Sequence, residues 1–160
     1  MTLVVYLGGA RSGKSRLAVE RAAQSQAPVT FIATGEAGDE EMAERIAAHR
    51  RERPPHWRTL EEPRALAQAI ARVPDGETAL IDCLSLWVAN VGEAGGAALD
   101  AARARTGLTI AVTNEVGLGI VPENALARSY RDALGRVNAA WVDAAEEAWF
   151  VVAGKALPLT

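Results

Sequence analysis

The chain alternates between short continuous apolar runs and longer segments in which apolar residues recur every three or four positions. Short apolar runs are typical of strands buried on both faces of a sheet, and spacings of three and four are typical of helices with one buried face. The predicted strands are residues 3–7, 29–33, 79–82, 108–113 and 149–152. The predicted helices are residues 14–23, 39–51, 63–72, 84–91, 97–105 and 124–147. This alternation predicts an α/β fold with a mostly parallel sheet flanked by helices.

Local signals support three of these helices. Acidic residues from Asp39 onward open the second helix and Arg51 closes it, which complements the helix dipole. Pro63 stands at the predicted start of the third, where no backbone N–H is needed. The last helix carries one apolar stripe, predicted to face the core, at Leu126, Tyr130, Leu134, Val137, Trp141 and Ala144.

Composition narrows the class of protein. The 160 residues, 49% of them hydrophobic, predict a single globular domain over residues 1–160. A net charge of −3 gives no sign of a nucleic-acid partner, and the single cysteine, Cys83, excludes an internal disulfide. No run approaches the ~18 apolar residues of a membrane helix, so we expect a cytoplasmic protein without a membrane partner.

The clearest motif is Gly8-Gly9-Ala10-Arg11-Ser12-Gly13-Lys14-Ser15, which follows a predicted strand and opens a predicted helix. This spacing and context are typical of a phosphate-binding loop. The glycines let backbone N–H groups wrap around phosphate oxygens, Lys14 neutralises the β- and γ-phosphates, and Ser15 can ligate Mg²⁺. The alternative, a glycine-rich turn that binds nothing, is disfavoured by the strand and helix on either side.

Asp82 ends a predicted apolar strand, where proteins with this loop place a carboxylate that holds magnesium. We predict that Asp82 contacts the metal or the nucleotide. The alternative is that Asp82 caps the helix that follows it, and the two roles are compatible.

Both histidines lie in residues 45–59, among five arginines. Such a cluster suits a polyanion such as a triphosphate, although charge runs are more often solvated helix faces. His49 lies seven residues after Met42 and three after Ile46, so spacing alone favours a packed histidine over a catalytic one. His56, beside Trp57 and two prolines, is predicted to be structural.

The sequence resembles the bifunctional adenosylcobinamide kinase/adenosylcobinamide-phosphate guanylyltransferase family of cobalamin biosynthesis. The resemblance covers nearly the whole chain, and four blocks carry it: the phosphate loop through Arg16, Phe31-Ile32-Ala33-Thr34, the arginine-rich residues 45–59, and residues 112–124 with Thr113-Asn114-Glu115-Val116-Gly117, which run on into Gly135-Arg136-Val137-Asn138. It implies a P-loop NTPase (RecA-like) fold, Mg²⁺ as cofactor, GTP and ATP as substrates, and a homotrimer.

The resemblance also implies roles for particular residues. His49 matches the histidine that becomes covalently guanylylated, and it joins Lys14 of the phosphate loop as a predicted catalytic residue. The positions matched to the guanine nucleotide are Ala33, Thr34, Gly35, Arg50, Arg51, Glu52, Arg53, Glu61 and Asp82. The family often has glutamate where Asp82 stands. The implied reactions are phosphorylation of adenosylcobinamide, followed by transfer of GMP through a guanylyl-histidine to adenosylcobinamide phosphate, giving adenosylcobinamide-GDP.

Two other functions fit the loop. A small-molecule kinase without nucleotidyl transfer would not need His49. A regulatory GTP switch would read guanine through an Asn-Lys-x-Asp motif, whereas the nearest strand end here reads Thr113-Asn114-Glu115-Val116. The missing motif counts against the switch.

Overall fold

The structure, a computed structural model, describes residues 2–51, 53–92 and 94–159. Within these residues a seven-stranded sheet has the strand order β3-β2-β4-β5-β1-β6-β7. The strands are β1 (Thr2–Gly8), β2 (Val29–Ala33), β3 (Arg58–Glu61), β4 (Thr78–Asp82), β5 (Leu108–Asn114), β6 (Glu147–Val152) and β7 (Lys155–Pro158). All neighbours pair in parallel except β6 and β7. The predicted α/β fold with a mostly parallel sheet is confirmed.

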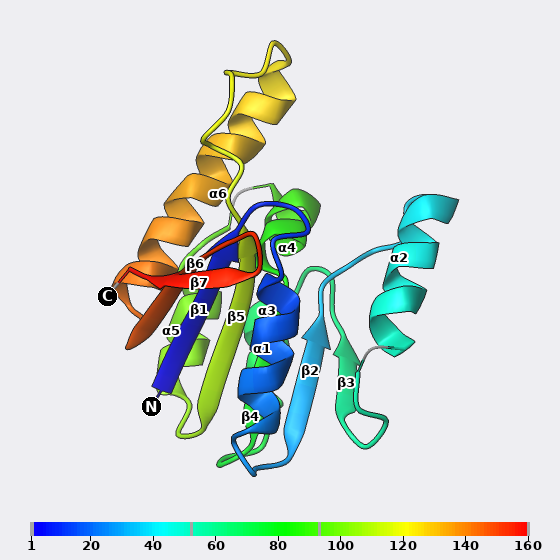
Figure 1. Ribbon diagram of the computed structural model, residues 1–160, viewed down its shortest axis with the longest axis vertical. Coiled ribbons are helices and arrows are strands. Elements are labelled where there is room, and N and C mark those ends of the chain that lie inside the picture. The colour runs from blue at the N-terminus through cyan, green and yellow to red at the C-terminus, as the bar shows by residue number, and fades with distance from the viewer. Residues whose placement is uncertain (1, 52, 93, 160) are drawn as a thin grey trace.

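Helices cover both faces of this sheet (Figure 1). They are α1 (Lys14–Ala23), α2 (Glu40–Arg51), α3 (Leu66–Ala71), α4 (Leu84–Val91), α5 (Ala97–Ala104) and α6 (Ala125–Asp143). Successive residues of a strand point to opposite faces, and β1 shows this directly. Val4 packs in the core cluster that contains Ala18 of α1, whereas Leu3 and Val5 pack in the cluster that contains α3 to α6. The two clusters form a core layer on each face of the sheet.

The parallel strands bring their carboxyl ends to one edge of the sheet. Gly8, at the end of β1, is paired with Asn114 at the end of β5, and Ala33 of β2 is paired with Asp82 of β4. The segment that follows Gly8 leads directly into α1. Ligands of open α/β sheets bind at this edge, and here the phosphate loop and Asp82 both reach it.

Three details of the predicted helices are wrong. The third helix begins at Leu66 and not at Pro63, because Glu62 Oε1 accepts the N–H groups of Arg64 and Ala65 and holds a turn ahead of the helix. The last helix ends at Asp143 instead of residue 147, since the chain must turn to enter β6 beside β1. Leu126 is 79% exposed and does not face the core.

The sequence pattern did not predict β3 and β7. Both are four residues long, and none of their side chains is buried. Each lies at an edge of the sheet, where a strand needs no apolar face to complete its backbone pairing. Across the part of the chain that the structure describes, no helix has the length and apolar run needed to cross a membrane.

Candidate active site

The phosphate loop joins β1 to α1 in the strand–loop–helix context that the motif predicts. Gly13 has φ of 99°, a left-handed conformation that favours glycine, and it occupies the N-cap of α1 without a side-chain acceptor. Gly8 has no room for a side chain, because a Cβ atom there would lie 2.4 Å from the carbonyl oxygen of Val151. Lys14 is buried, and its Nζ donates to the Gly9 carbonyl oxygen at 2.9 Å.

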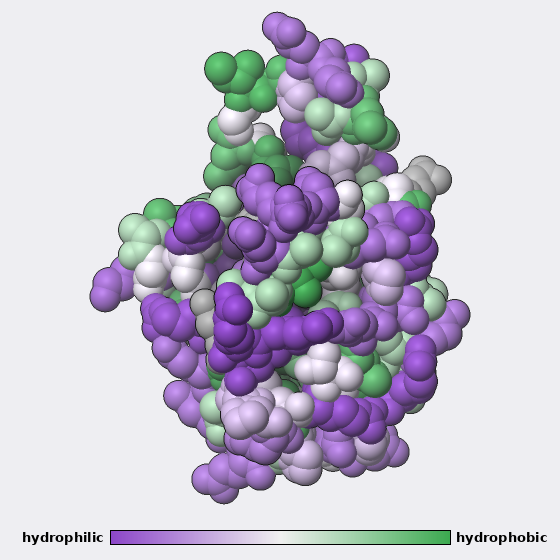
Figure 2. Space-filling view, turned by 90° about the vertical axis from the view of Figure 1, so that its right-hand side faces the viewer, coloured by the Kyte–Doolittle hydropathy of each residue, from purple (hydrophilic) through white to green (hydrophobic). Residues whose placement is uncertain are grey.

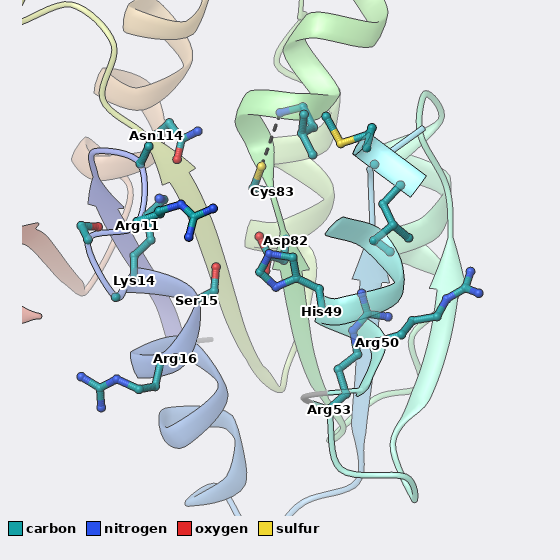
Figure 3. Close-up of a pocket in the computed structure, with 18 of the residues that line it drawn as sticks. Arg11, Lys14, Ser15, Arg16, His49, Arg50, Arg53, Asp82, Cys83 and Asn114 are labelled. Atoms are coloured by element: carbon teal, nitrogen blue, oxygen red, sulfur yellow. Dashed lines mark hydrogen bonds between the residues drawn. The ribbon is translucent and has the colours of Figure 1, made fainter. Parts of the chain in front are cut away.

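A cavity of about 520 Å³ opens beside this loop at the carboxyl edge of the sheet, with α2 on its opposite side (Figure 3). This volume is in the range of nucleotide and cofactor sites. The predicted site residues that line the cavity are Ala10, Arg11, Ser12, Gly13, Lys14, Ser15, Ala33, Gly35, His49, Arg50, Arg53, Glu61 and Asp82. Gly8, Gly9, Thr34 and Arg51 do not line it, and Glu52 lies outside the described residues.

His49 faces the phosphate loop from across the cavity. It lies in the last turn of α2, its side chain is exposed, and Figure 3 shows its ring beside the Asp82 carboxylate. Burial raises the pKa of Asp82 above its ordinary value, while the charge of His49 and a hydrogen bond from Ser15 oppose this rise. The structure thus brings together the imidazole, the carboxylate and the loop hydroxyl, which are far apart in the sequence.

Asp82 does not cap the helix that follows it, so that alternative is wrong. The N-cap of α4 is Cys83, whose Sγ accepts the backbone N–H of Leu86 at 3.5 Å. The Asp82 carboxylate is directed toward Ser15 and His49 instead.

Two arginines of the predicted cluster differ in their surroundings. Arg50 forms an ion pair with Glu61 of β3. Arg53 stacks on the ring of Phe31, with its guanidinium carbon 3.6 Å from the ring centre. Its Nε and Nη1 are buried and have no hydrogen-bond partner among the described residues. Burial lowers the pKa of Arg53, and Asp82 partly offsets this effect. Because a guanidinium remains charged in proteins and Arg53 lines the cavity, Arg53 gives the cavity a cation.

The cavity also has lining residues that the sequence did not predict. Met42, Ile46 and Leu86 form an apolar wall between α2 and α4, and Asn114 lies at the end of β5. Met42, Ile46 and His49 share one face of α2, so the stripe at this spacing was a usable signal. The stripe indicated that this face of α2 is covered by other residues. The structure shows that the face borders the cavity and not the core.

His56 is outside this cavity. It is exposed in the connection before β3, whereas its neighbour Trp57 is buried in the core. The two histidines lie in the same arginine-rich segment, but only His49 lines the cavity beside the phosphate loop.

The residues at the loop fit a magnesium ion. Ser15 and Asp82 offer a hydroxyl and a carboxylate that already contact one another through a hydrogen bond. No cluster of three or more His, Cys, Asp or Glu side chains occurs in the described residues. Mg²⁺ needs no such cluster, because it keeps several waters and takes one or two protein oxygens together with phosphate oxygens.

In comparisons with known proteins, nearly the whole chain matches one family and three curated relatives. Residues 3–159 match the family model described as cobinamide kinase / cobinamide phosphate guanyltransferase. A bifunctional adenosylcobalamin biosynthesis protein, CobP of Pseudomonas aeruginosa, is 47% identical over 97% of this chain and 95% of its own length. The proteins named CobU of Escherichia coli and Salmonella typhimurium, with the same description, are 39% and 42% identical over 95% of this chain and 96% of theirs.

Proposed function

The chain belongs to the cobinamide kinase / cobinamide phosphate guanyltransferase family, and we propose that the cavity beside its phosphate loop performs both reactions. The protein is a bifunctional enzyme of adenosylcobalamin biosynthesis with nucleotide substrates. The observation that carries the proposal is that His49 and the phosphate loop line the same cavity from opposite sides. We further propose that residues 1–160 act as one catalytic domain.

In the first reaction, the hydroxyl of adenosylcobinamide accepts the γ-phosphoryl group of ATP or GTP. Lys14 and the backbone N–H groups of the loop bind the β- and γ-phosphates, where negative charge is concentrated. Ser15 and Asp82 are the residues that would hold Mg²⁺, which when bound supplies positive charge to the phosphates.

In the second reaction, an unprotonated nitrogen of His49 attacks the α-phosphorus of GTP. A nitrogen–phosphorus bond forms, the bond to the bridging oxygen of the β-phosphate breaks, and pyrophosphate leaves. A phosphate oxygen of adenosylcobinamide phosphate then attacks the same phosphorus and releases His49, giving adenosylcobinamide-GDP. An imidazole suits this task because its ordinary pKa of about 6.5 leaves it largely unprotonated at neutral pH. Arg53 lines the cavity, and its charged guanidinium can pair with phosphate oxygens.

The experiment that tests this function is labelling with GTP carrying the label on the α-phosphorus. We expect the wild-type protein with Mg²⁺ to take up α-label and no γ-label, with the added mass on His49 in a bond that acid breaks and alkali leaves intact. His49→Asn should abolish the label and guanylyl transfer while phosphorylation of adenosylcobinamide continues. Lys14→Ala should lower both reactions by ~10²-fold.

His56→Asn is the matched control, because His56 lies outside the cavity. Label that persists in His49→Asn, or that disappears only in His56→Asn, would show that the wrong histidine has been chosen. Phosphorylation without any label would favour the small-molecule kinase.

We also propose that the protein forms a homo-oligomer, a homotrimer by family resemblance. Large apolar side chains gather on the loop after β5 and the start of α6: Leu118 is 80% exposed, Ile120 97% and Leu126 79%. Green side chains collect at the top of Figure 2, where this loop and the start of α6 project in Figure 1. Apolar surface of this kind supports a protein–protein contact.

A further inference from the structure

Asn114 is the cavity residue whose position the two reactions do not yet explain. It ends β5, which lies between β1 with its phosphate loop and β4 with Asp82. Because these strands are parallel, Asn114 reaches the same edge of the sheet as the loop and Asp82, where it lines the cavity. Figure 3 shows it on the side of Lys14 and Arg11, across the cavity from His49.

Side chains from two helices hold the backbone of Asn114. Its N–H donates to Ser85 Oγ of α4 at 3.3 Å, and its carbonyl oxygen accepts from Asn138 Nδ2 of α6 at 2.9 Å. The next N–H, that of Glu115, donates to the carbonyl oxygen of Gly8 at 3.0 Å. The strand end is therefore fixed against α4, α6 and the start of the phosphate loop. The carboxamide of Asn114 makes no hydrogen bond to any described residue and is available to a ligand.

Asn138 is a polar residue in an apolar surrounding. It is 5% exposed, and Leu134, Val137 and Trp141 of the same helix are buried in the core. Its Oδ1 accepts from Thr113 Oγ1 at 2.6 Å, and Thr113 is fully buried. A buried amide is costly unless both of its ends are bonded. Here both ends are bonded, and both bonds hold the end of β5.

From this arrangement we propose that Asn114 is a catalytic residue of phosphoryl transfer, that its carboxamide N–H donates to a γ-phosphate oxygen, and that Asn138 positions it. This inference rests on the proposed function. In that reaction the acceptor hydroxyl oxygen bonds to the γ-phosphorus while the bond to the β–γ bridging oxygen breaks. The nucleoside diphosphate leaves with the bond electrons, and the hydroxyl proton passes to solvent. A fixed neutral donor stabilises the charge on the γ-oxygens during this step.

The same geometry implies that Asn114 acts unequally on the two reactions. Guanylyl transfer takes place at the α-phosphorus, which must approach His49 on the α2 side of the cavity. Asn114 lies on the loop side, where Lys14 binds the γ-phosphate. Its loss should therefore impair phosphoryl transfer far more than guanylylation of His49.

Separate assays of the two half-reactions test the inference. For Asn114→Ala we expect the kcat of adenosylcobinamide phosphorylation to fall ~10²-fold, the KM for the nucleotide to change less than ~3-fold, and labelling of His49 by α-labelled GTP to slow by no more than ~3-fold. Asn114→Asp should be at least as impaired in phosphorylation, because it places a carboxylate beside the γ-phosphate.

Asn138 is tested through two variants. Asn138→Asp keeps an acceptor for Thr113 and removes the N–H that Asn114 accepts, and we expect the same one-sided loss of kcat. Thr113→Val keeps the side-chain shape and breaks the bond that orients Asn138, so it should lower kcat ~3- to 10-fold. This second variant tests the positioning role independently of whether Asn138→Asp folds. His49 labelling reports that each variant is folded.

Different results would overturn the role of Asn114, the positioning by Asn138, and the proposed function itself. Unchanged phosphorylation in Asn114→Ala, or equal losses in both half-reactions, would overturn the role of Asn114. Losses in Thr113→Val that fall equally on both half-reactions would overturn positioning through Asn138. A wild-type protein that neither phosphorylates adenosylcobinamide nor labels His49 would overturn the proposed function, and this inference with it.

Discussion

Two glycines in the connection from β2 to α2 differ in what surrounds them. A Cβ atom on Gly35 would lie 3.3 Å from Ile46 Cδ1 and 3.6 Å from Leu86 Cδ1, whereas nothing lies within 4 Å of one on Gly38. Neither glycine has a left-handed φ, so alanine strains neither backbone. We expect Gly35→Ala to displace Ile46, narrow the cavity and weaken GTP binding about tenfold, as a modest overpacking cost predicts. Isothermal calorimetry measures the affinity.

Gly38→Ala is the control, because it adds the same methyl group to the same connection in open space. We expect its GTP affinity to match that of the wild type. Equal weakening in both variants would show that the connection, and not the cavity wall, limits binding.

Both tyrosines of the chain should ionise late. Burial raises the pKa of Tyr130 to about 12, and burial also raises the pKa of Tyr6. In the unfolded chain both should ionise near pH ~10. Because the folded pKa values are the higher ones, this stabilisation is complete below pH ~10 and is lost as pH rises through the folded values.

The near-ultraviolet absorbance of tyrosinate should thus appear at higher pH in the native protein than in urea. Tyr130→Phe should lose less stability than the wild type between pH ~10 and ~12. A native titration that coincides with the denatured one would contradict the burial of Tyr6 and the partial burial of Tyr130.

The sequence could identify some site residues and not others for a physical reason. Lys14 and Ser15 were predictable because the phosphate loop is built from adjacent residues, so its geometry is local. The spacing of His49 indicated a covered helix face but not what covers it, and only the family resemblance pointed to catalysis. Met42 and Ile46 were missed in the same way. Asn114 depends on bonds from α4 and α6, which no local pattern records.

At the scale of elements, one buried arginine connects helix α3, the segment that leads into β4, and strand β5. Arg105 follows α5 and is 6% exposed. Its guanidinium donates to the carbonyl oxygens of Ile70, Val73 and Glu77, which end α3 and lead into β4, and to Thr109 Oγ1 of β5. We expect Arg105→Met to cost about 3 kcal/mol of unfolding free energy, because these carbonyl oxygens lose a charged donor.

Urea denaturation measures this loss. Arg103→Met is the matched control, since Arg103 is an exposed residue of the neighbouring helix, and it should change stability by less than ~0.5 kcal/mol. Similar losses in both variants would contradict the role of Arg105 in joining the elements.

The elements also show which parts of the fold the pattern can predict. Strands β1, β2, β4 and β5 are covered on both faces, so burial alone gives them continuous apolar runs. Strand β3 has no buried side chain, and its place is set by pairing with β2. Such edge strands are determined by the neighbouring backbone, which a hydrophobic pattern does not contain.

At the scale of the whole molecule, the apolar loop and start of α6 predict self-association. We expect light scattering to give the mass of an oligomer, a trimer by family resemblance. Ile120→Lys should shift this mass toward the monomer, because a charge on a 97% exposed side chain costs nothing until a contact buries it. Val152→Lys, at a 46% exposed side chain on β6, tests whether any apolar-to-lysine change has this effect. A monomeric wild type, or equal shifts in both variants, would contradict an interface at this loop.

The helix that carries His49 has a further consequence for dynamics. None of the α2 side chains that the structure describes is buried, and the two large apolar ones, Met42 and Ile46, line the cavity. Helices in proteins are held mainly by the packing of such a face, and segments with little of it open locally. Backbone amides of α2 should therefore exchange with deuterium much faster than those of the central strands. A nucleotide in the cavity would supply the missing packing partner, so that the substrate itself completes the tertiary structure of the helix on which it reacts.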